Sequence, residues 1–205
     1  MNHKSKTRWL VTTAMFAAVA SVLMFIETPL PLMPPFLKLD PSMLPILIGS
    51  FILGPAAGTA MALIKAFVHV FSSTTGGVGE LADFLMTAAF AVTASLVYRR
   101  CHTKKGAAAA CAAGTLALTA MGVAANYFLL IPFYAKIMPM EAIFSACAAV
   151  NPSITGMSGY LLYGVIPFNL IKGTLVSLLT FPVYKKMSKQ IHKFMQEIAP
   201  VPETK

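Results

Sequence analysis

The chain has 205 residues, of which 57% are hydrophobic and only 11% are charged, and its formal net charge is +9. Soluble domains carry about 25% charged residues, so the composition predicts an all-α integral membrane protein in which residues 1–205 form one transmembrane domain. The positive charge does not indicate nucleic-acid binding, because 12 of the 16 Lys and Arg residues fall in three clusters that flank apolar runs. Such clusters mark cytoplasmic segments. They are Lys4, Lys6, Arg8; Arg99, Arg100, Lys104, Lys105; and Lys185, Lys186, Lys189, Lys193, Lys205.

The cysteines and histidines show no pattern of a metal or redox site. Cys101, Cys111 and Cys147 have no CxxC spacing, and an odd number of scattered cysteines argues against a disulfide framework. The four histidines form no HExxH motif. We therefore expect no metal ligands, no catalytic residues and no resident cofactor.

The first apolar run, residues 9–30, is long enough to span a membrane. A cleaved signal peptide is the alternative, but the cleavage-like triplet at 18–20 lies in the middle of the run, which disfavours it. Ala14 and Ala18 form a small-xxx-small face that allows close approach of another helix. Packing within the bundle and contact with a partner are equally compatible with this face.

Four prolines at positions 29, 31, 34 and 35 break the helix that the first run begins. The break also carries Leu39 and Asp40. Irregular backbone beside a membrane span must be hydrated, packed on protein or wrapped around a ligand. We predict that residues 29–45 form a loop over a ligand site at the membrane surface.

The apolar run 42–71 is interrupted by Gly54 and Pro55, so it forms either one kinked helix or two short helices with a tight turn. Two spans, 42–55 and 57–71, place all three basic clusters on the same side, and we therefore favour two. Further spans are expected at 81–98, 106–132 and 159–184. The prediction is a bundle of six transmembrane helices with both termini in the cytoplasm. The segment 141–150 is too short to span and is expected to lie in the interface.

Ionisable and amide side chains within these spans are candidates for a site, because they are costly in lipid unless they face a cavity or each other. Glu80 and Asp83 share one face near the start of the fourth span, although N-terminal capping is the alternative explanation for both. Asn126 lies in an otherwise apolar helix, where a helix–helix hydrogen bond is the alternative, and Tyr127 beside it adds aromatic surface. Asn169 and Lys172, three residues apart, complete the polar set.

Several motifs give the chain a resemblance to a known family. The segments FLKLDPSMLP, TGGVGELADF, NYFLLIPFY and PFNLIKG resemble the riboflavin-specific substrate-binding (S) components of energy-coupling factor (ECF) transporters. The similarity extends from about residue 14 to residue 184. At position 83 the family commonly has asparagine, where this chain has aspartate.

The resemblance implies a bacterial cell-membrane protein that binds riboflavin and works with a transmembrane coupling protein and two cytoplasmic ATPase subunits. It implies substrate contacts from Leu39, Asp40, Glu80, Asp83, Asn126, Asn169 and Lys172. The Ala14 and Ala18 face resembles the surface for the coupling subunit. ATP would be used by the partners only, because the chain has no GxxxxGK[ST] phosphate-binding loop.

There are three alternatives to this function. An S component for another vitamin is compatible with the same motifs. A proton-coupled carrier would use Glu80 or Asp83, but the inverted repeat typical of such carriers is not visible. A membrane enzyme is disfavoured, because no arginine lies within a span and no His–carboxylate pair is evident in the sequence.

Overall fold

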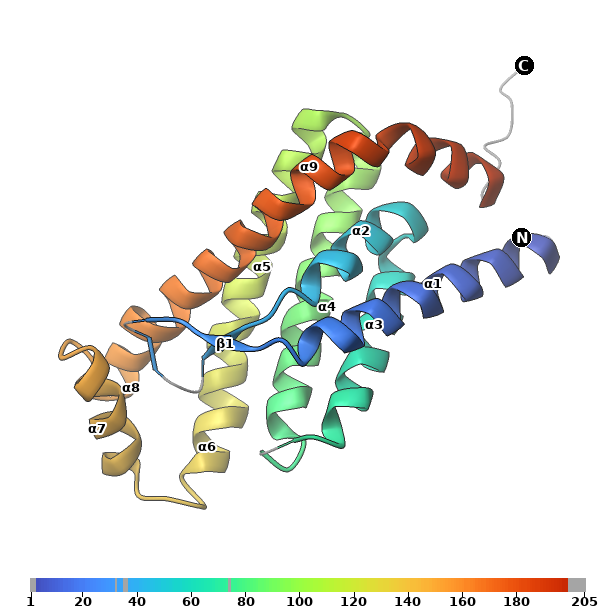
Figure 1. Cartoon of the computed structure of the whole chain (residues 1–205). Helices are drawn as coiled ribbons and strands as arrows, with labels where there is room; N and C mark the ends of the chain where they lie inside the picture. The colour runs from blue at the N-terminus through green and yellow to red at the C-terminus, as the bar shows by residue number, and fades with distance from the viewer. Residues whose placement is uncertain (1–2, 32, 35–36, 74, 199–205) are drawn as a thin grey trace.

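The computed structural model describes residues 3–31, 33–34, 37–73 and 75–198, with backbone alone at residues 3, 4, 104 and 184–198 (Figure 1). The described chain is helical apart from one small sheet. Its helices are α1 (His3–Met24), α2 (Met43–Leu53), α3 (Pro55–Val70), α4 (Val78–Arg100), α5 (Lys104–Ala125), η1 (Asn126–Leu130), α6 (Ile131–Tyr134), α7 (Met140–Val150), α8 (Met157–Gly159), η2 (Tyr160–Val165) and α9 (Ile166–Ile198). The sheet consists of β1 (Thr28–Pro29) and β2 (Lys38–Leu39).

Four helical segments within the described residues are long and apolar enough to cross a membrane. They are Ser5–Met24, Val78–Arg100, Lys105–Tyr134 and Met157–Val183. The third segment runs continuously through α5, η1 and α6, and the fourth runs through α8, η2 and the first part of α9. Helices α2, α3 and α7 are apolar but shorter.

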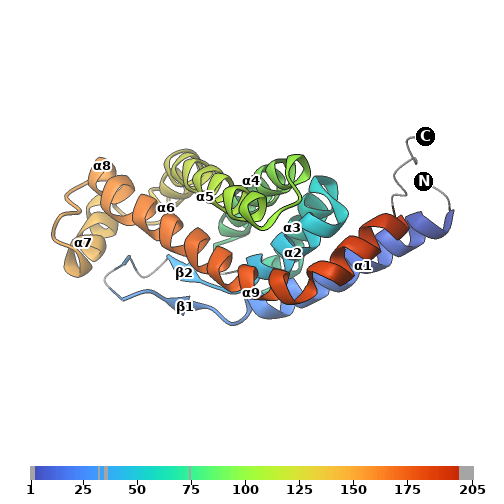
Figure 2. The same cartoon turned by 90° about the horizontal axis from the view of Figure 1, so that it is seen from above.

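The expected first span extends too far, because α1 ends at Met24 rather than at residue 30. Pro29 and Pro31 have no N–H to continue the helix, and proline disfavours helical conformation in the residue before it. The chain instead forms an antiparallel pair in which Thr28 is opposite Leu39 and Pro29 is opposite Lys38. The described residues between 25 and 40 therefore form a hairpin, in which β1 and β2 lie beside α9 (Figure 2).

Helices α2 and α3 form an antiparallel pair rather than one kinked helix. They are separated only by Gly54, which has a φ of 95°, and α3 begins with Pro55. Gly58 packs so closely on Ser50 that an added Cβ would lie 2.9 Å from the Ser50 Cβ, and a Cβ on Gly49 would lie 2.7 Å from Cε of Met61. Residues farther from Gly54 on α2 thus contact residues farther from Gly54 on α3. This pattern of contacts requires that the two helices run in opposite directions.

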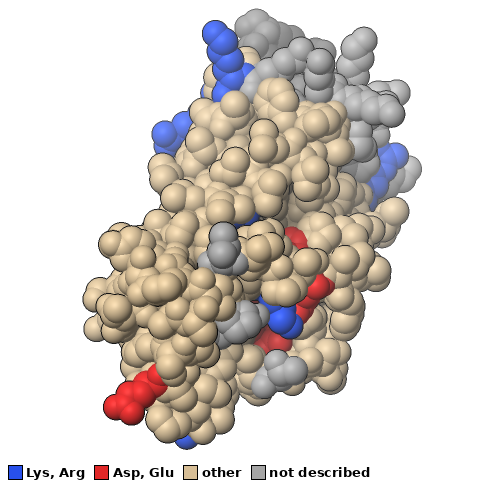
Figure 3. Space-filling view, turned by 60° about the vertical axis from the view of Figure 1, so that its left-hand side comes forward, with Lys and Arg blue, Asp and Glu red and all other residues tan. Residues whose placement is uncertain are grey.

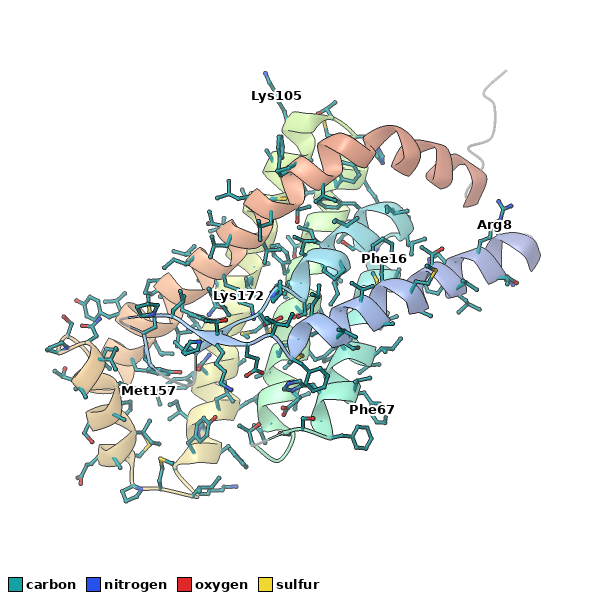
Figure 4. The ribbon with its side chains drawn as sticks, viewed as in Figure 1. Arg8, Phe16, Phe67, Lys105, Met157 and Lys172 are labelled. Atoms are coloured by element: carbon teal, nitrogen blue, oxygen red, sulfur yellow. The ribbon has the colours of Figure 1, made fainter. Side chains whose placement is uncertain are left out.

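The buried core is divided among three groups of helices. The first group packs α2, α4, α5 and α9 around Phe51, Phe90 and Tyr98, and the second packs α1 and α3 onto α2 and α4. The third, around Ile143 and Tyr160, joins α6 and α7 to η2. Arg8 and Lys105 lie at one end of the molecule, whereas Phe67 and Met157 lie at the other (Figure 4).

Candidate functional site

A cavity of about 370 Å³ lies where the hairpin crosses the bundle. Lysine and acidic side chains gather in a hollow on this face, whereas the surrounding surface is almost free of charge (Figure 3). The polar part of the lining is Glu27, Lys38, Asp40, His69, Ser72, Thr75, Glu80, Asp83, Asn126, Tyr134, Asn169 and Lys172. The apolar part includes Met24, Phe25, Leu37, Met86, Leu130 and Phe168.

Two lysines and two aspartates alternate at the inner side of the cavity. Lys172 points from α9 into the bundle (Figure 4), where its Nζ lies 2.9 Å from Oδ2 of Asp40 and 3.8 Å from Oδ1 of Asp83. Lys65 on α3, fully buried, places its Nζ 2.6 Å from Oδ2 of Asp83. Buried ammonium groups are tolerated when each is paired in this way. The four side chains join α3, α4 and α9 to the hairpin.

Asp40 connects this network to the start of α2. Its Oδ1 accepts hydrogen bonds from the backbone N–H and the hydroxyl of Ser42, and Lys65 in turn donates to Ser42 Oγ at 3.1 Å. Burial disfavours the charged form of the Asp40 carboxyl, but Lys172, Lys65 and the Ser42 hydrogen bonds outweigh burial and lower its pKa below the ordinary value. Asp40 is therefore a carboxylate at neutral pH.

A second charged group lies at the mouth of the cavity. His69 of α3 has its Nδ1 3.1 Å from Oε1 of Glu80 and its Nε2 3.4 Å from Oε1 of Glu27. Glu27 also pairs with Lys38 of β2, with 2.5 Å between Oε2 and Nζ. Glu80 accepts a hydrogen bond from the Ser73 hydroxyl at 2.7 Å. Its carboxylate thus contacts the loop before α4 and also lines the cavity.

The two π-helical turns, η1 and η2, position the amide of Asn126. The first residue of η1 is Asn126 and the first residue of η2 is Tyr160, whose buried hydroxyl donates to Oδ1 of Asn126 at 2.6 Å. The Nδ2 group of Asn126 donates one hydrogen bond to the carbonyl of Gly122 at 2.8 Å. Because π-helical turns are rare and often occur at functional sites, this pair is evidence that the cavity is a built site.

Asn169 presents an unused acceptor to the cavity. Its Nδ2 donates to the carbonyl of Val165 at 2.9 Å, but its buried Oδ1 has no hydrogen-bond partner within the described residues. Oδ2 of Asp83 also accepts no hydrogen bond from the described residues. It differs from Oδ1 of Asn169 because it forms an ion pair with the Lys65 ammonium, 2.6 Å away. A buried amide oxygen without a partner costs about 1–3 kcal/mol. A ligand that donates a hydrogen bond would remove that cost.

The structure brings together six of the eight residues predicted from the sequence as substrate contacts. Asp40, Glu80, Asp83, Asn126, Asn169 and Lys172 all line the cavity. Leu39 and Tyr127 are not among its described lining residues. Leu39 is half-buried in β2, and Tyr127 has 47% of its surface exposed on the outer side of η1.

Four residues that were not among the predicted substrate contacts also contact the residues of the site: Glu27, Lys65, His69 and Tyr160. A signal existed for two of them. Lys65 and His69 are four residues apart on α3, so they share one face of an otherwise apolar helix. Tyr160 belongs to a set of aromatic residues that an interfacial belt explains equally well, and only the fold places its hydroxyl against Asn126.

The small-residue face of α1 points away from the core. Ala14 and Ala18 are exposed, whereas Ala17 is buried, and the Ser21 hydroxyl donates to the carbonyl of Ala17 at 2.8 Å. Exposed apolar side chains surround the two alanines, among them Leu10, Val11, Met15 and Val22. This face is available for lipid or for a second helix.

The comparisons with known proteins agree with one another. Residues 8–184 match the family of the ECF transporter, substrate-specific component. The chain is 33% identical to the riboflavin transporter RibU of Staphylococcus aureus, covering 91% of this chain and 93% of that protein. It is 28% identical to the riboflavin transporter FmnP of Bacillus subtilis, covering 92% and 96%. A solved structure of the S component of a bacterial ECF transporter superimposes with a TM-score of 0.72 at 31% identity, covering 91% of this chain and 98% of that chain.

Proposed function

Because the chain belongs to the substrate-specific components of ECF transporters, we propose that it binds riboflavin from outside the cell and delivers it inward within a transporter complex. Its relatives in Staphylococcus aureus and Bacillus subtilis are named riboflavin transporters. The observation that carries the proposal is the cavity beneath the hairpin, in which six side chains singled out for substrate contact converge. The function is transport, and the family is not one of enzymes.

The cavity suits a flat ligand that is partly apolar and rich in hydrogen-bonding groups. Its volume of about 370 Å³ is within the range of small-molecule sites. Met86, Leu130 and Phe168 provide apolar walls for a ring system. Asn169 Oδ1 accepts a hydrogen bond, and the second N–H of Asn126 Nδ2 donates one. An imide edge or a hydroxylated chain meets both demands, and riboflavin has both.

Free riboflavin fits this site better than a phosphorylated flavin. Each described ammonium group of the cavity lining, that of Lys38 or Lys172, is already paired with a carboxylate. A phosphate dianion would have to break one of these pairs and would face Glu27 and Glu80 at the mouth. Exclusion of the phosphate ester follows from this charge balance.

The proposal includes a membrane topology, that is, the number of spans and the side of the membrane on which each terminus lies. The four long segments cross the bacterial cell membrane, and the α2–α3 pair crosses it as two short helices, which gives six spans. The basic ends of α1, the α4–α5 turn and the tail of α9 face the cytoplasm, so both termini are inside. The cavity and its hairpin then face outward.

Uptake requires partners, because the chain has no phosphate-binding loop of its own. We assign ATP hydrolysis to two cytoplasmic ATPase subunits and the contact with a transmembrane coupling protein to the exposed Ala14 and Ala18 face. No resident cofactor is needed for binding.

Reconstitution in liposomes tests the proposal. With a coupling module and internal ATP, vesicles should accumulate labelled riboflavin against a gradient, and an excess of unlabelled riboflavin should compete while the phosphate ester does not. The same vesicles without ATP should only bind. Accumulation that is independent of ATP but driven by a proton gradient would contradict the assignment.

A further inference from the structure

The final part of α9 extends beyond the apolar segment that can cross a membrane. That segment ends at Val183, whereas the helix continues to Ile198. Residues 184–198 are called the α9 extension below, and at 1.5 Å per residue they measure about 22 Å. Pro182 lies inside the helix at this boundary, where its missing N–H and its ring favour a bend. The extension turns away from the direction of α4 and α5 and runs across the end of the molecule that carries the α4–α5 turn (Figure 1).

Apolar and basic residues are separated on the α9 extension. At 3.6 residues per turn, its apolar residues fall on one face, within an arc of about 100°. They are Tyr184, Met187, Ile191, Phe194, Met195 and Ile198. The lysines fall on the opposite face, within a second arc of about 100°. They are Lys185, Lys186, Lys189 and Lys193.

This register goes beyond a mark of membrane topology. Lysines in any register after a span would favour the cytoplasmic side. A helix with an apolar face and an opposed lysine face is typical of segments that lie in the plane of a lipid–water interface. Acyl chains cover the first face of such a helix, and anionic headgroups attract the second.

The end of the molecule that the α9 extension crosses is basic. Lysine and arginine side chains gather there in the space-filling view (Figure 3), and the exposed ones are those of Lys6, Arg8, Arg99, Arg100 and Lys105. Apart from Glu197, the acidic residues that the structure describes line the cavity or belong to α7. This end of the molecule therefore attracts an anionic surface.

Building on the membrane topology proposed above, we propose that the α9 extension is a surface helix that binds the anionic phospholipid headgroups of the inner leaflet. Lipid is the occupant of its apolar face, because the helix is continuous with the membrane segment and no linker separates the extension from the bilayer. A tethered segment meets the adjacent lipid surface at high effective concentration, whereas a partner protein has to be recruited. The inner end of α9 is thereby anchored to the membrane.

Spin labels on the full chain test where the extension lies. In a protein whose three cysteines are replaced by alanine, one label is attached through Met187→Cys on the apolar face or Gln196→Cys on the lysine face. The protein is placed in nanodiscs of phosphatidylcholine, or of phosphatidylcholine and phosphatidylglycerol in equal parts. Collisions with oxygen, which concentrates in lipid, and with a neutral water-soluble nickel chelate report the surroundings of each label.

The expected pattern depends on both face and lipid. With phosphatidylglycerol, the label at position 187 should collide with oxygen and be shielded from nickel, whereas the label at position 196 should remain accessible to nickel. In phosphatidylcholine alone, or at high salt, the label at position 187 should become accessible to nickel, because the attraction between lysines and headgroups is absent or screened.

Charge variants measure the contribution of the lysines. Lys189→Gln and Lys193→Gln should each lower the ratio of bound to free extension about fivefold in phosphatidylglycerol nanodiscs. The corresponding Lys→Arg changes keep the charge and should preserve the ratio. Arg100→Gln with Lys105→Gln is the matched control, because it removes two exposed charges at the same end but outside the extension, and it should leave the ratio unchanged.

An apolar variant separates lipid insertion from simple charge attraction. Ile191→Ser should release the extension although all its lysines remain, and Ile191→Leu should not. A label at position 187 that is shielded from both oxygen and nickel would show that the extension packs on protein, and would overturn the proposal. Equal behaviour in the two lipid mixtures would also overturn it, as would shielding that requires added coupling or ATPase subunits.

Riboflavin titration of the same nanodiscs keeps this proposal distinct from the proposed transport function. Loss of flavin binding with the expected label pattern would contradict the riboflavin assignment and leave the surface helix in place. Normal flavin binding with a label at position 187 that is always accessible to nickel would do the reverse. Thermal unfolding checks that each variant is folded.

Discussion

Tyr160 contributes a single hydroxyl to the site, and its effect on binding acts through Asn126. Its hydrogen bond of 2.6 Å to Oδ1 of Asn126 fixes the orientation of the amide, whose Nδ2 keeps one N–H for a ligand. Tyr160→Phe should lower riboflavin affinity about fivefold, because one hydrogen bond contributes about 1 kcal/mol. Calorimetric titration measures the change. Tyr127→Phe is the matched control and should leave affinity unchanged, since Tyr127 lies outside the cavity lining; equal losses in both variants would remove the positioning role.

Lys65 is a second residue whose importance depends on its partners. It is fully buried and pairs with Asp83 at 2.6 Å. Lys65→Met should lower the free energy of unfolding by about 3 kcal/mol, because it leaves a buried carboxylate with only the more distant Lys172. Thermal unfolding in detergent measures the loss. Adding Asp83→Leu should restore much of the stability without restoring ligand binding, and a double variant that is less stable than the single one would contradict the pairing.

At the residue scale, the sequence predicts which side chains are unusual better than it predicts what they contact. Asp40, Asp83, Asn126 and Lys172 stand out because polar groups in apolar helices require partners. Their pairings join segments that are as many as 132 residues apart, as between Asp40 and Lys172, so no local pattern encodes them. Tyr127, also predicted as a substrate contact, is not among the described lining residues. It is adjacent to Asn126 in sequence, but neighbouring residues on a helix face different directions.

At the scale of elements, the close packing of α5 on α9 depends on Gly122. A Cβ at this position would lie 2.6 Å from Nδ2 of Asn169, so Gly122→Ala must displace the Asn169 amide. We expect riboflavin affinity to fall about tenfold with little change in melting temperature, because the strain is relieved within the cavity. Equilibrium fluorescence titration and thermal unfolding measure the two quantities.

Gly114 on the same helix provides the matched control. A Cβ there would lie 2.9 Å from Cδ2 of Phe90 and 3.0 Å from Cβ of Ala94, in the α4–α5 core and away from the cavity lining. Gly114→Ala should lower the melting temperature and leave affinity unchanged. If both variants affected stability and affinity in parallel, the site and the core would not be separable in this way.

Helices were predicted correctly where one sequence feature marks them. The end of a helix was misplaced where apolar length and proline content favour different boundaries. Apolar length marks the long helices, and Gly54 with Pro55 marks the α2–α3 turn. The end of α1 was misplaced because residues 25–30 are apolar enough to extend a span, whereas the prolines that follow end the helix. The β1–β2 pairing was not predicted, since two residues per strand leave no periodic pattern.

At the scale of the whole molecule, the surfaces proposed for ligand binding and for coupling are separate. The cavity lies beneath the hairpin, and the Ala14 and Ala18 face lies on the exposed side of α1. Changing both alanines to leucine should leave riboflavin affinity intact and abolish most ATP-driven uptake, because leucine keeps another helix from approaching closely. Vesicle uptake and detergent binding are measured on the same preparations.

Ala112→Leu, at an exposed alanine of α5, is the control for lipid-facing bulk and should preserve both activities. Loss of binding in the α1 variant would show that this face supports the fold rather than a partner. Equal loss of uptake in the α5 variant would assign the effect to membrane packing.

The membrane class and the riboflavin-transporter resemblance followed from the sequence, because composition, basic clusters and motifs are distributed along the whole chain. The closed form of the site did not, because it depends on how the hairpin meets α3, α4 and α9 in three dimensions. The ion pairs of Asp40 and Glu27 arise there. Pro34 also packs near Gly164 as a result.

Titration of the purified chain with riboflavin, without any partner protein, tests the central claim most directly. The preparation should be yellow or, once stripped of flavin, should quench added riboflavin saturably at one flavin per chain. Asn169, with its unused acceptor, should be required for full affinity. A colourless protein that leaves flavin fluorescence unchanged at every concentration would contradict the assignment of this cavity to riboflavin.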